Sequence, residues 1–427
     1  MHLSLSSTIA PLRSFSKPAR LFLIATIIDG IIYSSWTLFF NIFILARGFD
    51  KQYLGLVNSA PSVAALLLGI PLGLLSDRIG RRKAMLLGIL VATIALAGQV
   101  IVVRPALIIA LAFIGGLGNS LYTISQAPFM MRASTPQNRT LLFSLNFGLT
   151  TIAGSLGSLF AGQLPDLFSR VFHIAGDSAS AYQAVLLASV LLGSISLIPI
   201  FLIREPGLEA QPTQRQAPRP LNEVFFRSLV LKIAFPNLLI GLGAAILIPY
   251  MNVFFVERFH TSNQDLGVLF AISSLLIGVG SFTGPRLAAN LGSKIKAVVF
   301  TQGTSLVFLL LTGFSPVNWL AAAGLLVRGM LMNMAYPLYN AFSMEQIATD
   351  EQGAVNSLLG LTWQIGFAIG PYISGVVQEK YGFTPLFIAT TVLYFAATLF
   401  SWLFLRKMEA APHPETVGML TEAEPIH

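Results

Sequence analysis

Long apolar segments alternate with short polar segments along almost the whole chain of 427 residues. A helix needs about 20 mostly apolar residues to cross the roughly 30 Å hydrocarbon core of a bilayer. Segments of this kind occur near 20–45, 53–75, 84–103, 106–130, 139–163, 181–203, 230–256, 265–288, 295–314, 317–343, 352–377 and 384–405. The pattern therefore predicts an all-α membrane protein with twelve transmembrane helices.

A polar, proline-rich stretch interrupts this pattern after the sixth apolar segment. It runs from Arg204 to Phe226 and is too polar to continue a membrane helix. We therefore predict an N-terminal cytoplasmic segment at 1–20, a six-helix bundle at 21–203 and a cytoplasmic linker at 204–228. A second six-helix bundle at 229–405 and a disordered cytoplasmic tail at 406–427 follow.

The two predicted bundles resemble each other in sequence. Gly73, Asp77 and Gly80 follow the second apolar segment, and Pro285, Ala289 and Gly292 follow the eighth at a constant offset of 212 residues. A late proline in the fourth segment, Pro128, is matched by Pro337 in the tenth. Internal duplication is common among secondary transporters, so we expect two pseudo-symmetric six-helix bundles.

The composition excludes most other classes of protein. Hydrophobic residues make up 55% of the chain and charged residues only 10%, whereas soluble domains carry about 25% charged residues. Cysteine is absent, and the five histidines form no H-x-x-x-H pair. No nucleophile, acid pair or metal set stands out at the predicted membrane surface. We therefore expect neither an enzyme nor a bound metal or other cofactor.

The basic residues lie mainly on one side of the predicted membrane topology. Of the 26 Lys and Arg residues, 19 fall in the termini, the linker and the loops on that side, and 6 fall on the opposite side. Because Lys and Arg accumulate in cytoplasmic loops, this bias predicts a cell-membrane protein with both termini in the cytoplasm. Topology also explains the net charge of +8, so we expect no nucleic-acid partner.

The most specific motif lies between the second and third predicted helices. The segment from Gly73 to Lys83, GLLSDRIGRRK, resembles the signature loop of the major facilitator superfamily (MFS). The resemblance covers about residues 20 to 405 and implies the MFS fold. It also implies that Asp77 contacts the start of the eleventh helix, near residues 351–354, when the transport cavity faces outward. The candidate gating residues are Gly73, Asp77, Arg78, Gly80, Arg81 and Arg82. The alternative is a basic cytoplasmic turn without a gating role.

Two charged residues lie deep within predicted membrane spans. Asp29 lies nine residues beyond Arg20, and Arg328 nine beyond Trp319, which places both near the middle of the bilayer. An uncompensated charge at this depth costs about 2.5 to 3.5 kcal/mol, so each should face water, substrate or an opposite charge. We predict that Asp29 is a proton-coupling site and that Arg328 is its charge partner or a substrate-binding residue. The alternative is a structural pair that does not titrate during transport.

Aromatic and polar residues recur at helical spacing around these charges, on the first, fourth, seventh and tenth predicted helices. In the family that this chain resembles, these four helices line the transport cavity. The candidate cavity residues are Tyr33, Trp36, Phe40, Asn119, Tyr122, Gln126, Asn237, Tyr250, Asn252, Met332, Tyr336 and Tyr339. Such a lining suits an apolar or amphipathic molecule, because aromatic rings stack on apolar groups and attract cations. Helix packing is the alternative role for each residue.

A short linker, an acidic residue in the first helix and an aromatic cavity resemble bacterial drug and small-molecule exporters. We therefore predict a secondary active transporter that moves a small organic molecule by alternating access, with proton-coupled efflux. One alternative is a facilitator or proton symporter that imports a small organic anion bound by Arg328. Another is a membrane sensor or scaffold that does not transport. The expected partners are the substrate, protons and the lipid bilayer, and we expect a monomer.

Overall fold

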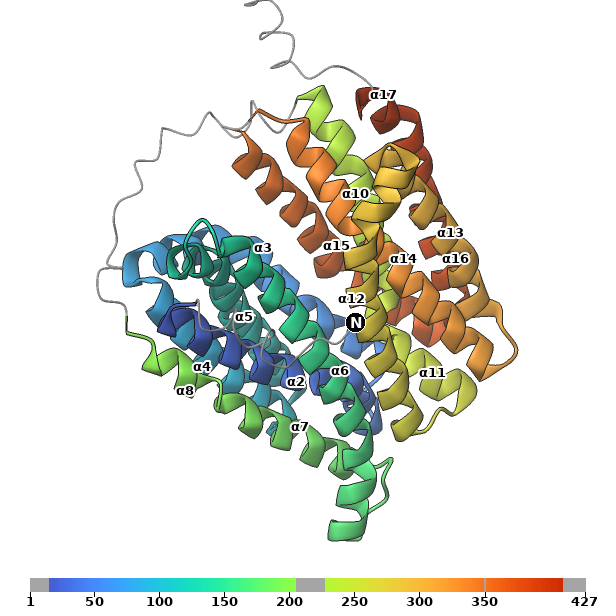
Figure 1. The fold of residues 1–427 in the computed structure, drawn as a ribbon. Helices are drawn as coiled ribbons and strands as arrows, with labels where there is room; N and C mark the ends of the chain where they lie inside the picture. Colours follow the sequence, from blue (N-terminus) through green and yellow to red (C-terminus); the bar gives the residue numbers. More distant parts are fainter. Residues whose placement is uncertain (1–14, 205–226, 349–350, 410–427) are drawn as a thin grey trace, which may run out of the picture. The chain divides into compact units, whose positions relative to one another are not determined.

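The computed structural model describes residues 15–204, 227–348 and 351–409. Most of the predicted N-terminal segment 1–20, linker 204–228 and tail 406–427 lies outside these residues. Throughout the described ranges the regular structure is helical, with no strand. Ten helices there are long and apolar enough to cross a membrane, and the long helices α14 and α15 bring the set to the predicted twelve (Figure 1).

The helix boundaries lie close to the predicted ones. The first half contains α2 (Lys17–Ala46), α3 (Lys51–Ile79), α4 (Arg81–Ile101), α5 (Pro105–Ala133), α6 (Arg139–Phe172), α7 (Ala179–Ser194) and α8 (Leu197–Leu202). The second half contains α10 (Ser228–Leu247), η1 (Ile248–Tyr250), α11 (Met251–Phe259), α12 (Asn263–Leu291), α13 (Lys294–Phe314), α14 (Asn318–Glu345), α15 (Gln352–Tyr381), α16 (Thr384–Phe400), η2 (Ser401–Leu405) and α17 (Arg406–Glu409). α6 extends past the predicted end at residue 163 and ends at Phe172.

Three predicted helices are interrupted. The sixth is divided into α7 and α8, and Pro199 near the start of α8 has no N–H to continue the backbone ladder. The seventh changes to a short 3₁₀ turn, η1, around Pro249 before it continues as α11. The twelfth contains the five-residue π-helical segment η2. Proline thus explains two of the interruptions, and both leave backbone groups available for other partners.

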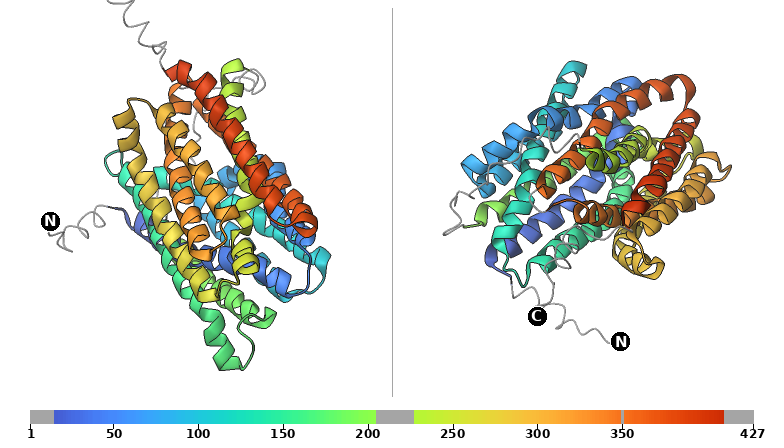
Figure 2. Two further views of the ribbon diagram at one scale, coloured as in Figure 1. Left: turned by 90° about the vertical axis from the view of Figure 1, so that its right-hand side faces the viewer. Right: turned by 90° about the horizontal axis from the view of Figure 1, so that it is seen from above.

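The described residues form two compact units. The boundaries of the two predicted six-helix bundles stay a prediction. The first unit combines the described residues before 205 with Ala245–Leu275 and Phe367–Leu386. In this unit, parts of α11, α12 and α15 therefore pack with the N-terminal helices. Helices α4 and α5 also run side by side there, as the views of Figures 1 and 2 agree. Gly118 permits this approach, since a Cβ there would lie 2.7 Å from the Gly88 carbonyl oxygen.

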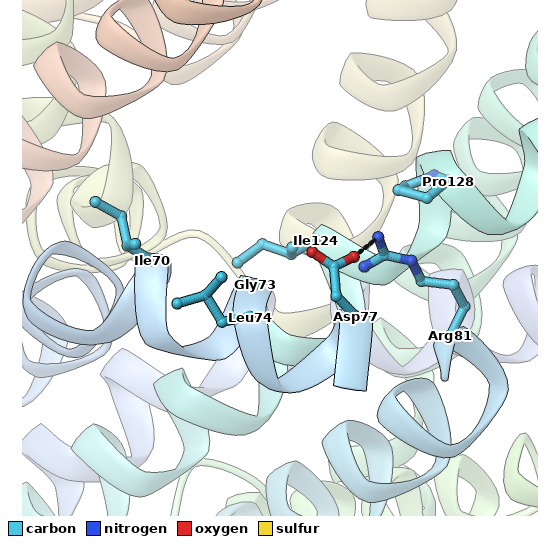
Figure 3. Close-up of a pocket in the computed structure, with 7 residues that line it drawn as sticks. All are labelled: Ile70, Gly73, Leu74, Asp77, Arg81, Ile124 and Pro128. Carbon is cyan, nitrogen blue, oxygen red and sulfur yellow. Dashed lines mark hydrogen bonds and ion pairs between the residues drawn. The ribbon is translucent and has the colours of Figure 1, made fainter. Parts of the chain in front are cut away.

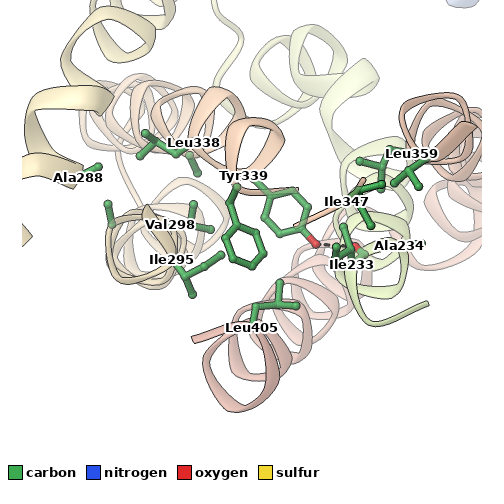
Figure 4. Close-up of a cluster of buried hydrophobic side chains, with 14 of the residues drawn as sticks. Ile233, Ala234, Ala288, Ile295, Val298, Leu338, Tyr339, Ile347, Leu359 and Leu405 are labelled. Atoms are coloured by element: carbon green, nitrogen blue, oxygen red, sulfur yellow. Dashed lines mark hydrogen bonds between the residues drawn. The ribbon is translucent and has the colours of Figure 1, made fainter. Parts of the chain in front are cut away.

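The second unit is formed by the described parts of Gln216–Ala244, Leu276–Gly366 and Phe387–His427. Figure 4 shows its main apolar cluster, to which α10, α12, α13, α14, α15 and η2 contribute side chains. Ile233, Ile295 and Leu405 are fully buried in it. The Tyr339 hydroxyl is also buried in this cluster and donates to the carbonyl oxygen of Ile233. The cluster thus joins helices that are distant in sequence.

The predicted duplication is visible at two helix junctions. Gly80 separates α3 from α4 with a φ of 89°, and Gly292 follows α12 with a φ of 64°. Both glycines have a positive φ, which residues with a Cβ rarely adopt. The two positions are separated by the same 212 residues as the surrounding sequence match.

Gly80→Ala is expected to lower the free energy of unfolding by about 1 to 3 kcal/mol, because its φ of 89° and ψ of 148° favour glycine. Gly73→Ala is the matched control. Gly73 lies inside α3, and a Cβ there would meet Ile124 at an ordinary 3.9 Å. Thermal unfolding of the two purified variants in detergent checks this prediction. Equal unfolding temperatures would contradict a conformational requirement at Gly80.

Candidate functional site

Asp29 lies in the middle of α2, partly buried among neutral groups. The Tyr122 hydroxyl, from α5, donates a hydrogen bond to Asp29 Oδ2 at 2.6 Å. Ser196, between α7 and α8, lies beside the same carboxyl group. Within the described residues, no Lys or Arg lies within ion-pair distance of Asp29. The carboxyl group therefore has hydroxyl neighbours and lacks a cationic partner in that part of the chain.

Tyr122 is held in place by the close packing of α4 and α5. A Cβ on Gly88 would lie 2.8 Å from the Tyr122 backbone nitrogen, so only glycine allows this approach. The Tyr122 side chain is 8% exposed and packs with Met85 and Ile89 of α4. Gln126, one helical turn further along α5, lies beside the Tyr122 hydroxyl. The hydroxyl that binds Asp29 is thus positioned by the packing of α5 against α4.

Arg328 is buried in the second unit, with a relative exposure of 7%. Its Nη2 donates to the Tyr394 hydroxyl of α16 at 2.6 Å, and its guanidinium group lies 5.4 Å from the centre of the Tyr394 ring. Its Nε has no hydrogen-bond partner. No carboxylate of the described residues lies within ion-pair distance of Arg328.

The two charged residues thus each have a tyrosine partner from their own half of the sequence. Asp29 belongs to the first compact unit and Arg328 to the second. Their mutual attraction across one cavity stays a prediction.

The other predicted cavity residues differ in their exposure. Tyr33 is 73% exposed, Tyr336 is 56% exposed, and Asn119 is also exposed. Gln126 and Met332 are partly exposed. Trp36 and Phe40 stack, with ring centroids 4.4 Å apart. A role of these side chains in lining a cavity stays a prediction.

Six of the predicted cavity residues are buried in helix packing, namely Phe40, Tyr122, Asn237, Tyr250, Asn252 and Tyr339. Asn237 donates to the Leu359 carbonyl oxygen at 2.9 Å, and Tyr250 to that of Pro371 at 2.9 Å. The Tyr339 hydroxyl binds Ile233, and Asn252 binds carbonyl groups of α2. A polar group buried away from water needs a partner, and a carbonyl group of a neighbouring helix supplies one here. A role of these residues in the transport cavity stays a prediction.

The motif after the second helix is more helical than predicted. Gly73, Asp77 and Arg78 lie in the last turns of α3, whereas Arg81 and Arg82 begin α4, so the connection shortens to Gly80. Asp77 forms an ion pair with Arg81, and Arg81 Nη1 also donates to Ser76 Oγ at 2.8 Å. Arg82 binds the carbonyl groups of Ile200 and Phe201, at the end of α8.

A recess of about 330 Å³ lies beside this motif. Figure 3 shows that α3, α4 and α5 line it, with Ile70 and Leu74 at one side and the Asp77–Arg81 pair and Pro128 at the other. Its lining residues are Ile70, Gly73, Leu74, Asp77, Arg81, Ile124 and Pro128. The predicted contact of Asp77 with residues 351–354 stays a prediction. Glu351 itself forms an ion pair with Arg227 at 2.7 Å.

A cluster of three asparagines was not recognised from the sequence. In the first unit, Asn41 of α2 is hydrogen-bonded to both Asn58 of α3 and Asn252 of α11. Only Asn252 was among the predicted site residues. Asn41 and Asn58 are isolated amides within apolar segments. Such residues are costly in a membrane span, which is the sequence signal that could have identified them.

Comparison with known proteins supplies the family relationship. A family model described as Major Facilitator Superfamily matches residues 21–238 and 233–423. The multi-drug resistance efflux pump PmrA of Streptococcus pneumoniae is 22% identical over 387 residues, which cover 87% of this chain and 91% of that protein. The multidrug resistance protein MdtG of Yersinia enterocolitica is 26% identical over 176 residues. This shorter match covers 40% of this chain and 42% of MdtG.

Solved structures share the fold at low sequence identity. A bacterial homolog of the human lysosomal transporter Spinster, in an inward-facing and unoccupied conformation, has a TM-score of 0.76 and 14% identity over 90% of this chain and 96% of its own. The nucleoside transporter NupG has a TM-score of 0.69 and 16% identity over 92% of this chain and 99% of its own. Both likenesses concern the architecture of the chain.

Proposed function

Because the chain belongs to the Major Facilitator Superfamily, a family of membrane transporters, we propose that it exports a small apolar or amphipathic organic molecule in exchange for protons. The two halves of the sequence would expose the substrate site to each side of the membrane in turn. Among its relatives, PmrA is named a multi-drug efflux pump, and its similarity extends over 87% of this chain. The names of PmrA and MdtG as multidrug proteins support export.

The observation that carries the proposal is the environment of Asp29. A carboxylate within a membrane span is costly in free energy. Among the described residues, the neighbours of the Asp29 carboxyl group include two hydroxyl groups and no cation. Binding a proton removes the charge, and releasing it on the other side of the membrane completes a coupled step. The Tyr122 hydroxyl can donate to the charged form and can remain within hydrogen-bond distance of the neutral form.

The exposed residues of α2 and α14 support the proposed substrate class. Tyr33 and Tyr336 present large aromatic surfaces, and Asn119 adds an amide on α5. The stacked rings of Trp36 and Phe40 lie further along α2. Aromatic faces bind apolar rings and organic cations with few specific hydrogen bonds. A lipophilic cation is therefore the first substrate type to test.

The proposed orientation follows from the basic residues. With 19 Lys and Arg on one side and 6 on the other, the termini lie in the cytoplasm and the protein resides in the cell membrane. In this orientation the junctions between α2 and α3 and between α11 and α12 face outward, whereas Gly80 and Gly292 face the cytoplasm. We further propose that the protein functions as a monomer.

Transport in proteoliposomes tests the proposal. A pH gradient should drive accumulation of ethidium, a lipophilic cation, and collapse of the gradient should release it. Without a gradient, labelled ethidium should still exchange for unlabelled ethidium across the membrane. Exchange without gradient-driven accumulation would contradict proton coupling. Absence of both from correctly folded protein, for ethidium and other cationic dyes alike, would instead favour a sensor or scaffold.

A second candidate function is import of a small organic anion. Arg328 favours it, because this buried cation has no described acidic partner and its Nε lacks a hydrogen bond. An anionic substrate group would supply the missing charge.

Arg328→Ala is expected to leave ethidium exchange largely intact if the protein exports cations. If the protein imports anions, the same change should abolish uptake of radiolabelled benzoate, because the binding charge is lost. Tyr394→Phe is the matched control, since it removes the same 2.6 Å hydrogen bond but keeps the guanidinium group. Benzoate uptake that Arg328→Ala abolishes and Tyr394→Phe preserves would overturn the export proposal.

A further inference from the structure

The asparagine cluster, defined as Asn41, Asn58 and Asn252, joins helices from both halves of the sequence within the first compact unit. Asn41 Nδ2 donates to Asn252 Oδ1 at 3.3 Å, and Asn58 Nδ2 donates to Asn41 Oδ1 at 3.0 Å. Asn252 Nδ2 donates in turn to the carbonyl oxygen of Leu38 at 2.9 Å. The three amides therefore connect α2, α3 and α11, and α11 packs directly against α2 (Figure 1).

The interruption of the seventh helix makes these contacts possible. In a continuous helix the Val253 N–H would donate to the Pro249 carbonyl oxygen. Here Val253 N donates to Asn252 Oδ1 at 2.9 Å, and the Pro249 carbonyl oxygen instead accepts Asn41 Nδ2 at 2.6 Å. The side chain of Asn252 thus replaces a backbone bond of its own helix. This frees a carbonyl group for a helix from the other half of the sequence.

The cluster is neutral and two of its three amides are buried, whereas the nearby charged contact is partly exposed. Asn41 is 6% exposed and Asn252 is 1% exposed. The nearby Lys51–Glu257 ion pair has an N–O distance of 2.7 Å, and the Glu257 side chain is 39% exposed. An exposed ion pair adds little to stability because water and salt screen its charges. A buried amide that loses its hydrogen-bond partner costs more free energy. The amides should therefore hold these helix ends together more strongly than the ion pair does.

The asparagine cluster lies near the outer side of the proposed transporter. Asn41 precedes Arg47 by six residues, and Asn252 precedes Arg258 by six. Both arginines belong to the sparsely basic side that the topology places outside the cell. Six helical residues correspond to about 9 Å, so the cluster lies just below the outer surface.

We propose that Asn41, Asn58 and Asn252 form the latch of the outer gate, which closes the transport path on the external side and breaks when that side opens. This inference rests on the proposed function, because it assumes alternating access and cytoplasmic termini. The amides act as positioning residues, since they hold helices together without contacting the substrate. Because they carry no charge, the latch is insensitive to salt.

Labelling of a single cysteine tests the latch directly, because the chain has no cysteine of its own. Tyr33 is 73% exposed and lies eight residues from Asn41 toward the membrane interior, about 12 Å along α2. Tyr33→Cys should react slowly with an impermeant maleimide added outside while the gate is closed. Adding Asn252→Ala should raise the initial labelling rate about tenfold, which corresponds to about 1.4 kcal/mol in the gate equilibrium.

Two further variants separate the latch from general destabilisation. Glu257→Gln removes the exposed ion pair and should change the labelling rate less than about twofold. Asn58→Ala removes one bond of the cluster and should give an intermediate rate, with an elution profile on size exclusion like that of the unmodified protein. Unchanged labelling in both asparagine variants would overturn the proposal. An equal increase in Glu257→Gln would also overturn it.

Labelling requires neither substrate nor a proton gradient, so it can fail independently of the proposed function. Faster labelling in a protein that transports no tested dye would support the latch and weaken the export proposal. Unchanged labelling in a protein with proton-driven export would overturn the latch alone.

Discussion

Asp29→Asn is expected to abolish pH-driven accumulation of ethidium in proteoliposomes while preserving exchange of labelled for unlabelled ethidium. Asparagine has nearly the same shape as aspartate and keeps an oxygen that can accept the Tyr122 hydrogen bond of 2.6 Å. It cannot take up and release a proton at working pH. The variant should therefore fold and bind substrate but lose the coupled step.

The matched control for this experiment is Asp166→Asn. Asp166 is also on a long helix of the first half, where its carboxylate accepts a hydrogen bond from Gln264 at 2.7 Å. It lies outside the predicted membrane interior, so its neutralisation should leave pH-driven accumulation intact. Retained accumulation in Asp29→Asn would place the coupling group elsewhere. Equal loss in both variants would indicate a general effect of acid removal.

Gly157→Leu is expected to have the largest effect on stability, with loss of most correctly folded protein. Gly157 of α6 faces Ile31 of α2, and a Cβ there would lie 2.6 Å from the Ile31 carbonyl oxygen and 2.7 Å from its Cα. Backbone atoms cannot move aside as a flexible side chain can. The two helices would have to separate, and overpacking of this kind costs about 3 kcal/mol or more.

Gly148→Leu is the control on the same helix, because a Cβ at Gly148 would meet no heavy atom within 4 Å. Size-exclusion profiles and thermal unfolding of the two variants in detergent measure the difference. A normal profile and unfolding temperature for Gly157→Leu would show that α2 and α6 do not require this close approach.

The fold was largely predictable because each membrane helix is a local property of the sequence. A span of about 20 apolar residues must satisfy its own backbone hydrogen bonds inside the bilayer, and only a helix can do so alone. The predicted span 295–314, for example, corresponds to α13 at Lys294–Phe314. The breaks at Pro199 and Pro249 are also local, but their geometry depends on neighbouring helices.

The candidate site was predictable only in part, because exposure depends on packing between helices. Tyr33 and Tyr339 were predicted from the same helical spacing, yet Tyr33 is 73% exposed and Tyr339 only 6%. The difference arises because Tyr339 lies against α10, where it finds the Ile233 carbonyl group. Asn41 stood out only as an isolated amide in an apolar segment, and the sequence could not identify its partners Pro249 and Asn252, which are more than 200 residues away.

The sequence by itself determined the helices and their number, because hydrophobicity and backbone hydrogen bonding act within each segment. Only the tertiary structure decided that Tyr122 binds Asp29, that Tyr394 binds Arg328, and that three asparagines join the two halves. The physical reason is that a buried polar group takes whichever partner the packing brings near it. Helix contacts such as that of Gly157 with Ile31 set this proximity, and no single segment encodes it.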